Sequence, residues 1–189
     1  MEEKIKARIM DATKIRRVLA RVATEVIERN RNLKNLVIVA VKPRGLAIGR
    51  RLARQIKDLE RVEVPVGLLD ISRYRDDAPA RSSPAAFAAA ALDFPVVKKN
   101  VLLVDDVLMT GRTMRAAMDA LIDRGRPLSV QLAVLIDRGH RELPIRPDYV
   151  GKVLPTSHRE KVRVRLKETD GSEEIIIAEP VKIGRAGKR

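Results

Sequence analysis

The stretch VLLVDDVLMTGRT, residues 101–113, combines the pattern of a strand with a concentration of charged and hydroxyl groups. Its first four residues are apolar and indicate a strand that is buried on both faces. This run leads directly into the adjacent carboxylates of Asp105 and Asp106. Apolar residues at helical spacing follow from residue 114 to residue 122. The stretch therefore predicts a strand, a loop and a helix, with the reactive groups in the loop.

The segments on either side repeat this alternation of strand and helix. Helical spacing covers residues 15–26, with Asp11 or Thr13 as the N-cap, and residues 46–56. Apolar runs at residues 35–41, 64–69 and 129–137 indicate further strands, and short extended runs follow at 149–154, 161–166 and 173–178. Strands that alternate with helices imply a mainly parallel sheet with helices on both faces. We expect one α/β domain over residues 1–189.

Composition limits the kinds of partner and compartment. The net charge of +14 and the isoelectric point near 10.6 indicate a polyanionic partner or phosphate ligands, although an arginine-rich solvated surface has the same composition. The absence of cysteine excludes disulfides and thiolate metal sites, and His140 and His158 are too few for an all-histidine zinc site. No apolar run reaches membrane-spanning length and the N-terminus lacks a signal-peptide core, so we expect a cytoplasmic protein without membrane contact.

Two segments fall outside the regular pattern. Residues 72–95 contain RYRDDAPARSSP, an alanine tract and Pro95, and a loop of this length usually forms a functional lid or is disordered. Residues 180–189 form a basic tail. We expect a flexible lid and a solvated tail, respectively.

The loop after the central strand has the composition of a phosphorylated-ribose site. Ligands of open parallel sheets bind beyond the carboxyl ends of the strands, and free N–H groups at a helix start attract phosphate. Carboxylates repel phosphate but accept hydrogen bonds from a sugar diol. A plain helix start with acids near its dipole is the alternative. The P-loop and dinucleotide-binding patterns are both absent.

The same residues resemble a known family. VLLVDDVLMTGRT is similar to the phosphoribosyl-pyrophosphate (PRPP) motif of the type I phosphoribosyltransferases. AVLIDRGHRELPIRPDYVGKVLPTS, IRRVLARVATEVIERN and LLDISRYRDD resemble the PyrR family, RNA-binding attenuation regulators of pyrimidine operons that are also uracil phosphoribosyltransferases. The resemblance implies a type I phosphoribosyltransferase fold with a small hood and a flexible lid. It also implies the reaction of uracil and PRPP to UMP and pyrophosphate, with Mg²⁺ carried largely by the substrates and not directly by protein side chains.

The resemblance assigns the catalytic role to Asp105 and Asp106, which would hold the ribose hydroxyls and stabilise positive charge at C1′. Pro43 stands where the family has threonine and Met109 where tyrosine is common, so both positions depart from the pattern. The residues expected to bind PRPP or UMP are Lys42, Arg44, Gly45, Arg75, Asp105, Asp106, Val107, Leu108, Met109, Thr110, Gly111, Arg112 and Thr113.

The resemblance also implies a base pocket and an RNA surface. The base would contact Arg138, Tyr149, Val150, Lys152 and Val162. The messenger RNA leader of a pyrimidine operon would contact Arg16, Arg17, Arg21, Arg29, Arg141, Arg146 and Lys152. Ala20 and Thr24 depart from the residues expected on the first helix, and each cation has a solvated surface charge as its alternative reading. We expect a homodimer or a higher homo-oligomer.

Two other functions remain open from the residues alone. One is a type I phosphoribosyltransferase acting on a purine base. The other is an RNA regulator that senses nucleotides with little or no catalytic turnover, which the departure at Pro43 and the unusual lid sequence favour.

Overall fold

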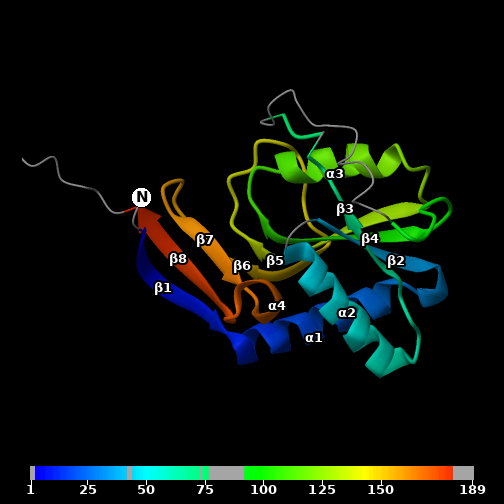
Figure 1. Ribbon diagram of the computed structural model, residues 1–189, viewed down its shortest axis with the longest axis horizontal. Coiled ribbons are helices and arrows are strands. Elements are labelled where there is room, and N and C mark those ends of the chain that lie inside the picture. Colours follow the sequence, from blue (N-terminus) through cyan, green and yellow to red (C-terminus); the bar gives the residue numbers. More distant parts are fainter. Residues whose placement is uncertain (1–2, 42–43, 73, 77–91, 181–189) are drawn as a thin grey trace, which may run out of the picture.

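Two sheets of different construction make up the protein (Figure 1). The computed structural model describes residues 3–41, 44–72, 74–76 and 92–180. The elements in chain order are β1 (Glu3–Asp11), α1 (Ala12–Arg29), the short 3-10 helix η1 (Leu33–Asn35), β2 (Leu36–Val41), α2 (Arg44–Glu60), β3 (Val66–Leu69), β4 (Asn100–Leu108), α3 (Arg112–Ile122), β5 (Ser129–Asp137), β6 (Tyr149–Val153), β7 (Lys161–Arg165), α4 (Lys167–Asp170) and β8 (Glu174–Pro180).

The larger sheet is parallel throughout and has the strand order β3-β2-β4-β5-β6. Alternate side chains of β4 enter two separate cores. Leu102 packs with residues of α1 and α2, whereas Leu103 packs with residues of α3. Helices thus cover both faces of the sheet, as Figure 1 shows. The predicted α/β class, a mainly parallel sheet with helices on both faces, is confirmed.

The smaller sheet is antiparallel, has the order β1-β8-β7 and corresponds to the expected hood. Strand β1 has no counterpart among the predicted elements. It pairs with β8 from Glu3 opposite Pro180 to Asp11 opposite Glu174, and two register shifts interrupt the pairing. These bulges break the alternation of inward and outward side chains by which a strand is recognised in a sequence.

The boundaries of three elements carry information about the site. Strand β4 runs through Asp105 and Asp106 and stays paired with β5 up to Leu108, so the carboxylates lie inside the strand and not after it. Strand β3 begins at Val66, two residues later than predicted. Asp11 caps α1, with its carboxylate accepting the N–H of Lys14 at 2.8 Å, which confirms one of the two predicted caps.

Most of the expected lid and nearly all of the expected tail cannot be compared with the structure. Residues 77–91 of the lid and 181–189 of the tail lie outside the described residues, as do Lys42 and Pro43. Pro180, with which the tail was expected to begin, belongs to β8. Within the described ranges, no helix is both long and apolar enough to cross a membrane.

Candidate phosphoribosyl site

Two carboxyl groups lie at the carboxyl end of the central strand. Asp105 is only 6% exposed, and Asp106 is half-buried beside it. Each accepts a backbone N–H at 2.9 Å, from Asp106 and Val107 respectively. Because β4 is flanked by β2 and β5, the pair is held by three adjacent strands.

The surroundings of this pair oppose its ionisation. Burial, followed by the neighbouring charge of Asp106, raises the pKa of Asp105 well above its ordinary value, although the cation of Arg75 acts against the rise. Burial also raises the pKa of Asp106, against the opposing effects of Asp105 and Arg44. A ligand that brings hydrogen-bond donors or positive charge would favour the ionised forms.

The loop that follows turns the chain into α3 and exposes backbone donors. Gly111 has φ of 93°, a left-handed conformation that glycine adopts without strain, and serves as the N-cap. No acidic residue occupies the first turn of α3. The first N–H groups of a helix lack intrahelical acceptors and carry the positive end of its dipole, so this turn suits a phosphate. Thr110 and Thr113 add hydroxyl groups beside it.

The side chain of Arg112 does not join these donors. Its guanidinium binds the carboxylates of Glu142 at 2.6 Å and Asp76 at 2.5 Å. Its backbone N–H faces the hydroxyl of Thr110 at 3.3 Å. Arg112 therefore contributes its backbone to the predicted phosphate site, while its side chain ties the beginning of the expected lid to the loop.

The predicted residues between the carboxylates and Thr110 act through their backbone. Leu108 is buried, and its carbonyl accepts the N–H of Arg138 at 3.0 Å. The carbonyl of Met109 accepts the guanidinium of Arg141 at 2.8 Å. Val107 packs against the core shared with α1 and α2. These residues fix the shape of the loop.

The beginning of α2 reaches the same place from the neighbouring strand. A Cβ on Gly45 would stand 2.6 Å from the carbonyl oxygen of Val104, so only glycine permits this approach to β4. The guanidinium of Arg44 pairs with Asp170 of the hood, at 2.6 and 3.2 Å, and its charge is felt by Asp106. Lys42, expected to bind PRPP with Arg44, lies outside the described residues.

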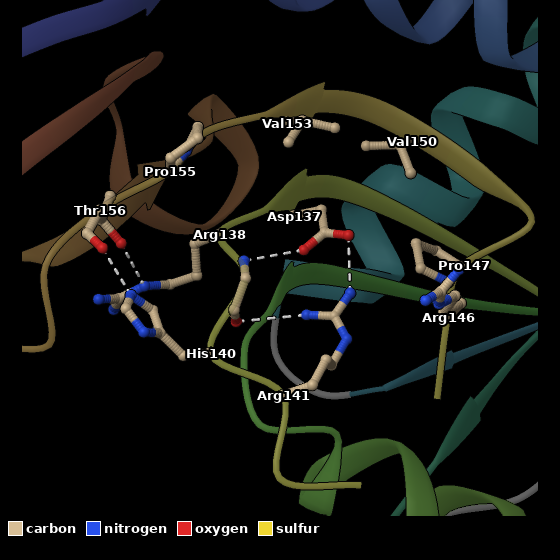
Figure 2. A pocket seen from close by; sticks show the side chains of 11 residues that line it. Asp137, Arg138, His140, Arg141, Arg146, Pro147, Val150, Val153, Pro155 and Thr156 are labelled. Carbon is tan, nitrogen blue, oxygen red and sulfur yellow. Dashed lines mark hydrogen bonds and ion pairs between the residues drawn. The ribbon is translucent and has the colours of Figure 1, made fainter. Parts of the chain in front are cut away.

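A pocket of about 550 Å³ opens beside this site, between the segment after β5 and strand β6 (Figure 2). One wall is basic and contains Arg138, His140 and Arg141. The opposite wall is formed by apolar side chains of β6, including Val150 and Val153. A pocket with an apolar wall and a few convergent polar groups is typical of a ligand site.

The basic wall is held by its own hydrogen bonds. Arg141 binds Asp137 at 2.7 Å and the carbonyls of Met109 and Ile145 at 2.8 Å, and thereby connects the pocket to the loop between β4 and α3. Arg138 is buried, and its guanidinium binds Thr156 at 3.0 Å and the carbonyls of Ser157 and Glu160 at 2.9 and 2.7 Å. Arg141 therefore fixes the segment after β5, and Arg138 fixes the segment that contains Thr156, Ser157 and Glu160.

The structure divides the residues predicted to bind the base. Arg138 and Val150 line the pocket of Figure 2. Tyr149 is buried in the core under α1, with its hydroxyl bound to Gln131 at 2.8 Å, and Val162 packs against that same core. Lys152 lines a different pocket. Only the backbone of these last three positions remains available to the predicted role.

The structure also divides the predicted RNA contacts among several places. Arg141 and Arg146 line the pocket of Figure 2. A second pocket of about 380 Å³ lies between α1 and β6, where the cations are Lys14, Arg17, Arg21 and Lys152. Arg29, at the far end of α1, pairs with Asp148 at 2.7 Å. Arg16 lines a third pocket, towards α2.

Several residues of the site were not predicted. Asp170 holds Arg44, and Asp137 holds Arg141. His140, with a left-handed φ of 61°, places one ring nitrogen 2.6 Å from the carbonyl of Thr156 and the other 3.1 Å from His158. His140 and Gly171 both have left-handed backbone conformations, which are seen in the φ angles of the structure and not in the sequence. The sequence of Asp170 and Gly171 indicates a turn and does not identify the cation that it faces.

Comparison with known proteins places this geometry in a family. The Phosphoribosyl transferase domain model matches residues 7–178. The Bifunctional protein PyrR of Pelotomaculum thermopropionicum is 56% identical over 92% of this chain and 96% of its own length, and that of Deinococcus radiodurans is 53% identical over 93% and 96%. A hypoxanthine phosphoribosyl transferase structure from Trypanosoma cruzi, 21% identical, has a TM-score of 0.73 with coverage of 95% and 94%, and shows the shared fold. The chain is a member of the PyrR family of phosphoribosyltransferases.

Proposed function

We propose that this protein is a uracil phosphoribosyltransferase that also regulates pyrimidine biosynthesis by binding a messenger RNA leader in response to UMP. The observation that carries the proposal is the carboxylate pair in the C-terminal half of β4, which is followed by a short loop and by the N-terminus of α3, where free N–H groups suit a phosphate. One loop thereby offers acceptors for a ribose diol and donors for the phosphate attached to it. The similarity to proteins named Bifunctional protein PyrR supports both halves of the proposal.

In the proposed reaction the bond from C1′ to the pyrophosphate oxygen breaks and a bond from C1′ to a uracil nitrogen forms, while that nitrogen loses its proton. Positive charge develops on the ribose as pyrophosphate leaves. Asp105 and Asp106 hold the ribose hydroxyls, and their negative charge favours this transition state. The chain needs to supply positioning and charge, and no nucleophile of its own.

The two ends of PRPP would contact different elements. The 5′-phosphate lies at the N–H groups and hydroxyls of residues 110–113. The pyrophosphate lies at the beginning of α2, where Gly45 lets the backbone approach β4. Arg44 binds Asp170 through Nε and Nη2, so the remaining Nη1 group is the part of this guanidinium that would face pyrophosphate while the pair with Asp170 stays in place.

The donors at the site fit Mg²⁺ that is bound mainly by substrate. Among the described residues, no three histidine or acidic side chains are grouped as metal ligands, and Asp105 and Asp106 are the only carboxylates at the end of β4. Magnesium usually keeps several waters and needs one or two carboxylates besides substrate phosphates. When bound, the ion neutralises charge on the leaving pyrophosphate.

The regulatory half of the proposal rests on the basic pockets beside the site. Phosphate neutralisation by Lys and Arg dominates RNA affinity, and splayed bases need stacking partners. Aromatic residues are only 2% of the chain, so arginine planes would supply the stacking. Arg17 and Lys152 face one pocket, and Arg146 faces the other. A homodimer would present two such surfaces to one leader.

A base panel with PRPP and Mg²⁺ tests the enzymatic half. We expect UMP from uracil and no nucleotide from hypoxanthine or guanine, measured by chromatography of the products. Replacing both Asp105 and Asp106 by Asn should abolish UMP formation while the circular dichroism spectrum stays unchanged. Formation of a purine nucleotide would identify a purine enzyme, and UMP-dependent RNA binding without UMP formation would identify a regulator alone.

A further inference from the structure

A third pocket lies away from the phosphoribosyl site, where α1, α2 and the turn that leads into β8 meet. Its volume is about 250 Å³. Arg16 of α1 forms one side, Arg51, Arg54 and Gln55 of α2 form another, and Glu173 closes the third. Three guanidinium groups from two helices thus converge on one small cavity.

Two acidic groups beside this pocket share one arginine as their partner. Arg51 donates to Glu168 at 2.8 and 2.7 Å and to Glu173 at 2.5 and 3.2 Å. The hydrogen bonds that Arg51 donates to Glu168 and Glu173 raise the pKa of Arg51 above its ordinary range, although burial acts against its charge. Arg51 therefore remains charged and is fully occupied.

The other polar groups of the pocket have no such partners. In the described part of the chain, Arg16, Arg54 and Gln55 make no side-chain hydrogen bond or ion pair; the field of Arg54 reaches Glu168, but no contact joins them. Two exposed guanidinium groups and one half-buried amide therefore line this pocket without a protein partner among the described residues. Hydrogen bonds between such cations and an anion are the strong, charge-assisted kind.

The size of the cavity limits what can fill it. Pockets for nucleotides and other drug-sized ligands usually measure about 300–1,000 Å³. A cavity of about 250 Å³ suits a smaller ligand. We propose that this pocket binds a small free phosphate-type anion, held by Arg16, Arg54 and Gln55, at a site separate from the phosphoribosyl site.

An anion in this pocket would change the electrostatic interactions between α2 and the hood. Arg51, which lines the pocket, joins α2 to Glu168 of α4 and to Glu173 before β8. An anion that pairs with Arg54 removes the attraction between Arg54 and Glu168 and reduces repulsion among the three guanidinium groups. The proposal does not depend on the base or RNA specificity of the protein.

Nuclear magnetic resonance with inorganic phosphate as the probe tests the site directly. In the full-length protein at constant ionic strength, phosphate should shift the side-chain amide signals of Gln55 with saturation. Arg54→Gln should weaken this affinity about tenfold, which corresponds to about 1.4 kcal/mol. Arg50→Gln removes the same charge from an exposed position of the same helix and should leave the affinity unchanged.

Three outcomes would overturn the proposal. Phosphate could shift the signals of Gly111 and leave those of Gln55 unmoved, which would confine phosphate to the α3 site. Arg54→Gln and Arg50→Gln could weaken the Gln55 response equally, which would show a general effect of charge. A leader RNA could displace phosphate from Gln55, which would assign the pocket to the RNA surface. Because Gly111 reports on the phosphoribosyl site separately, failure of one site is distinguishable from failure of the other.

Discussion

At the scale of single residues, Asp105 occupies a position that disfavours its own charge. Its carboxyl group is almost removed from water, and a second carboxyl group follows in the same strand. Burial and that neighbour raise the pKa of Asp105 in the folded protein. The group that we propose to hold the ribose hydroxyls is therefore a source of instability in the protein without ligand.

Replacing Asp105 by Asn should stabilise the fold while it abolishes UMP formation. The folded pKa lies above the ordinary value of 3.8, so the folded state binds the proton more tightly, and wild-type stability falls as the pH rises above about 4. The variant lacks this loss. We expect its free energy of unfolding to exceed the wild-type value by about 1 kcal/mol or more at pH 7.

Urea unfolding from pH 4 to pH 8 measures this difference. The gain should grow with pH, since it follows the ionisation of Asp105. Asp58→Asn, at an exposed position of α2, is the control and should give no such trend. A variant that is less stable than the wild type at pH 7 would contradict the assignment of strain to this carboxylate.

Single residues also show what could be predicted. The order of apolar residues, carboxylates and residues 110–113 predicted a strand, a loop and a helix start, and the structure has these elements in that order because they are adjacent in the chain. The assignment of sugar and phosphate groups to these residues stays a prediction. The directions of long side chains could not be predicted. Arg112 turns to Asp76 and Glu142, which are distant in sequence.

At the scale of elements, two arginines of α2 tie that helix to the hood. Arg51 joins Glu168 and Glu173, and Arg44 joins Asp170, whose carboxylate also accepts the N–H of Leu166 at 2.9 Å and the hydroxyl of Thr169 at 2.6 Å. The hydrogen bond from Arg44 is the main reason that the pKa of Asp170 falls below its ordinary value. The hood is thus held against α2, at whose beginning we propose that pyrophosphate binds.

Asp170→Asn should loosen this attachment. Asp170 has a lowered pKa, so its stabilisation is present above the ordinary value of 3.8 and is lost as the pH falls below it. We expect a loss of about 1 kcal/mol at pH 7, discounted because Arg44 is partly exposed, and a smaller loss at pH 3. Thermal unfolding at both pH values measures it.

Glu168→Gln provides the comparison, because its side chain is 48% exposed and shares Arg51 with Glu173. Its cost should stay within about 0.5 kcal/mol. Equal costs for the two variants, or a cost for Asp170→Asn that does not change with pH, would show that the pair with Arg44 is not what stabilises the hood.

Elements differ in how well the sequence predicts them. The apolar strands of the parallel sheet were predicted, because burial on both faces leaves a continuous hydrophobic run. Strand β1 was not, because its bulges break the alternation and its partner lies about 170 residues away. The residues predicted to contact the base do not share one pocket, since successive side chains of β6 point to opposite faces and separate Tyr149 from Val150.

At the scale of the whole molecule, the basic side chains differ in whether they have an acidic partner. Many are paired, including Arg44, Arg51 and Arg112. The pocket between α1 and β6 differs, because Arg17 and Lys152 face it without an ion pair in the described part of the chain. An RNA backbone would gain most from this surface.

Replacing Arg17 or Lys152 by Gln should weaken RNA binding through phosphate contacts alone. For single-stranded RNA each lost contact should reduce the slope of log K against log salt concentration by about 0.7. Filter binding of a pyrimidine-operon leader with UMP, at several salt concentrations, measures the slope. Lys34→Gln, exposed in η1, should leave it unchanged. Equal reductions in all three variants would mean that only net charge matters.

The pairing of β1 with β8 has a consequence for synthesis on the ribosome. All five strands of the parallel sheet lie between residues 36 and 153, so that sheet can be completed while translation continues. Strand β1 is made first, yet its neighbour begins only at Glu174. A nascent chain therefore carries this lysine-bearing segment without its partner strand until nearly all of the described residues have emerged. Its positive charges protect such an exposed segment from pairing with other nascent chains.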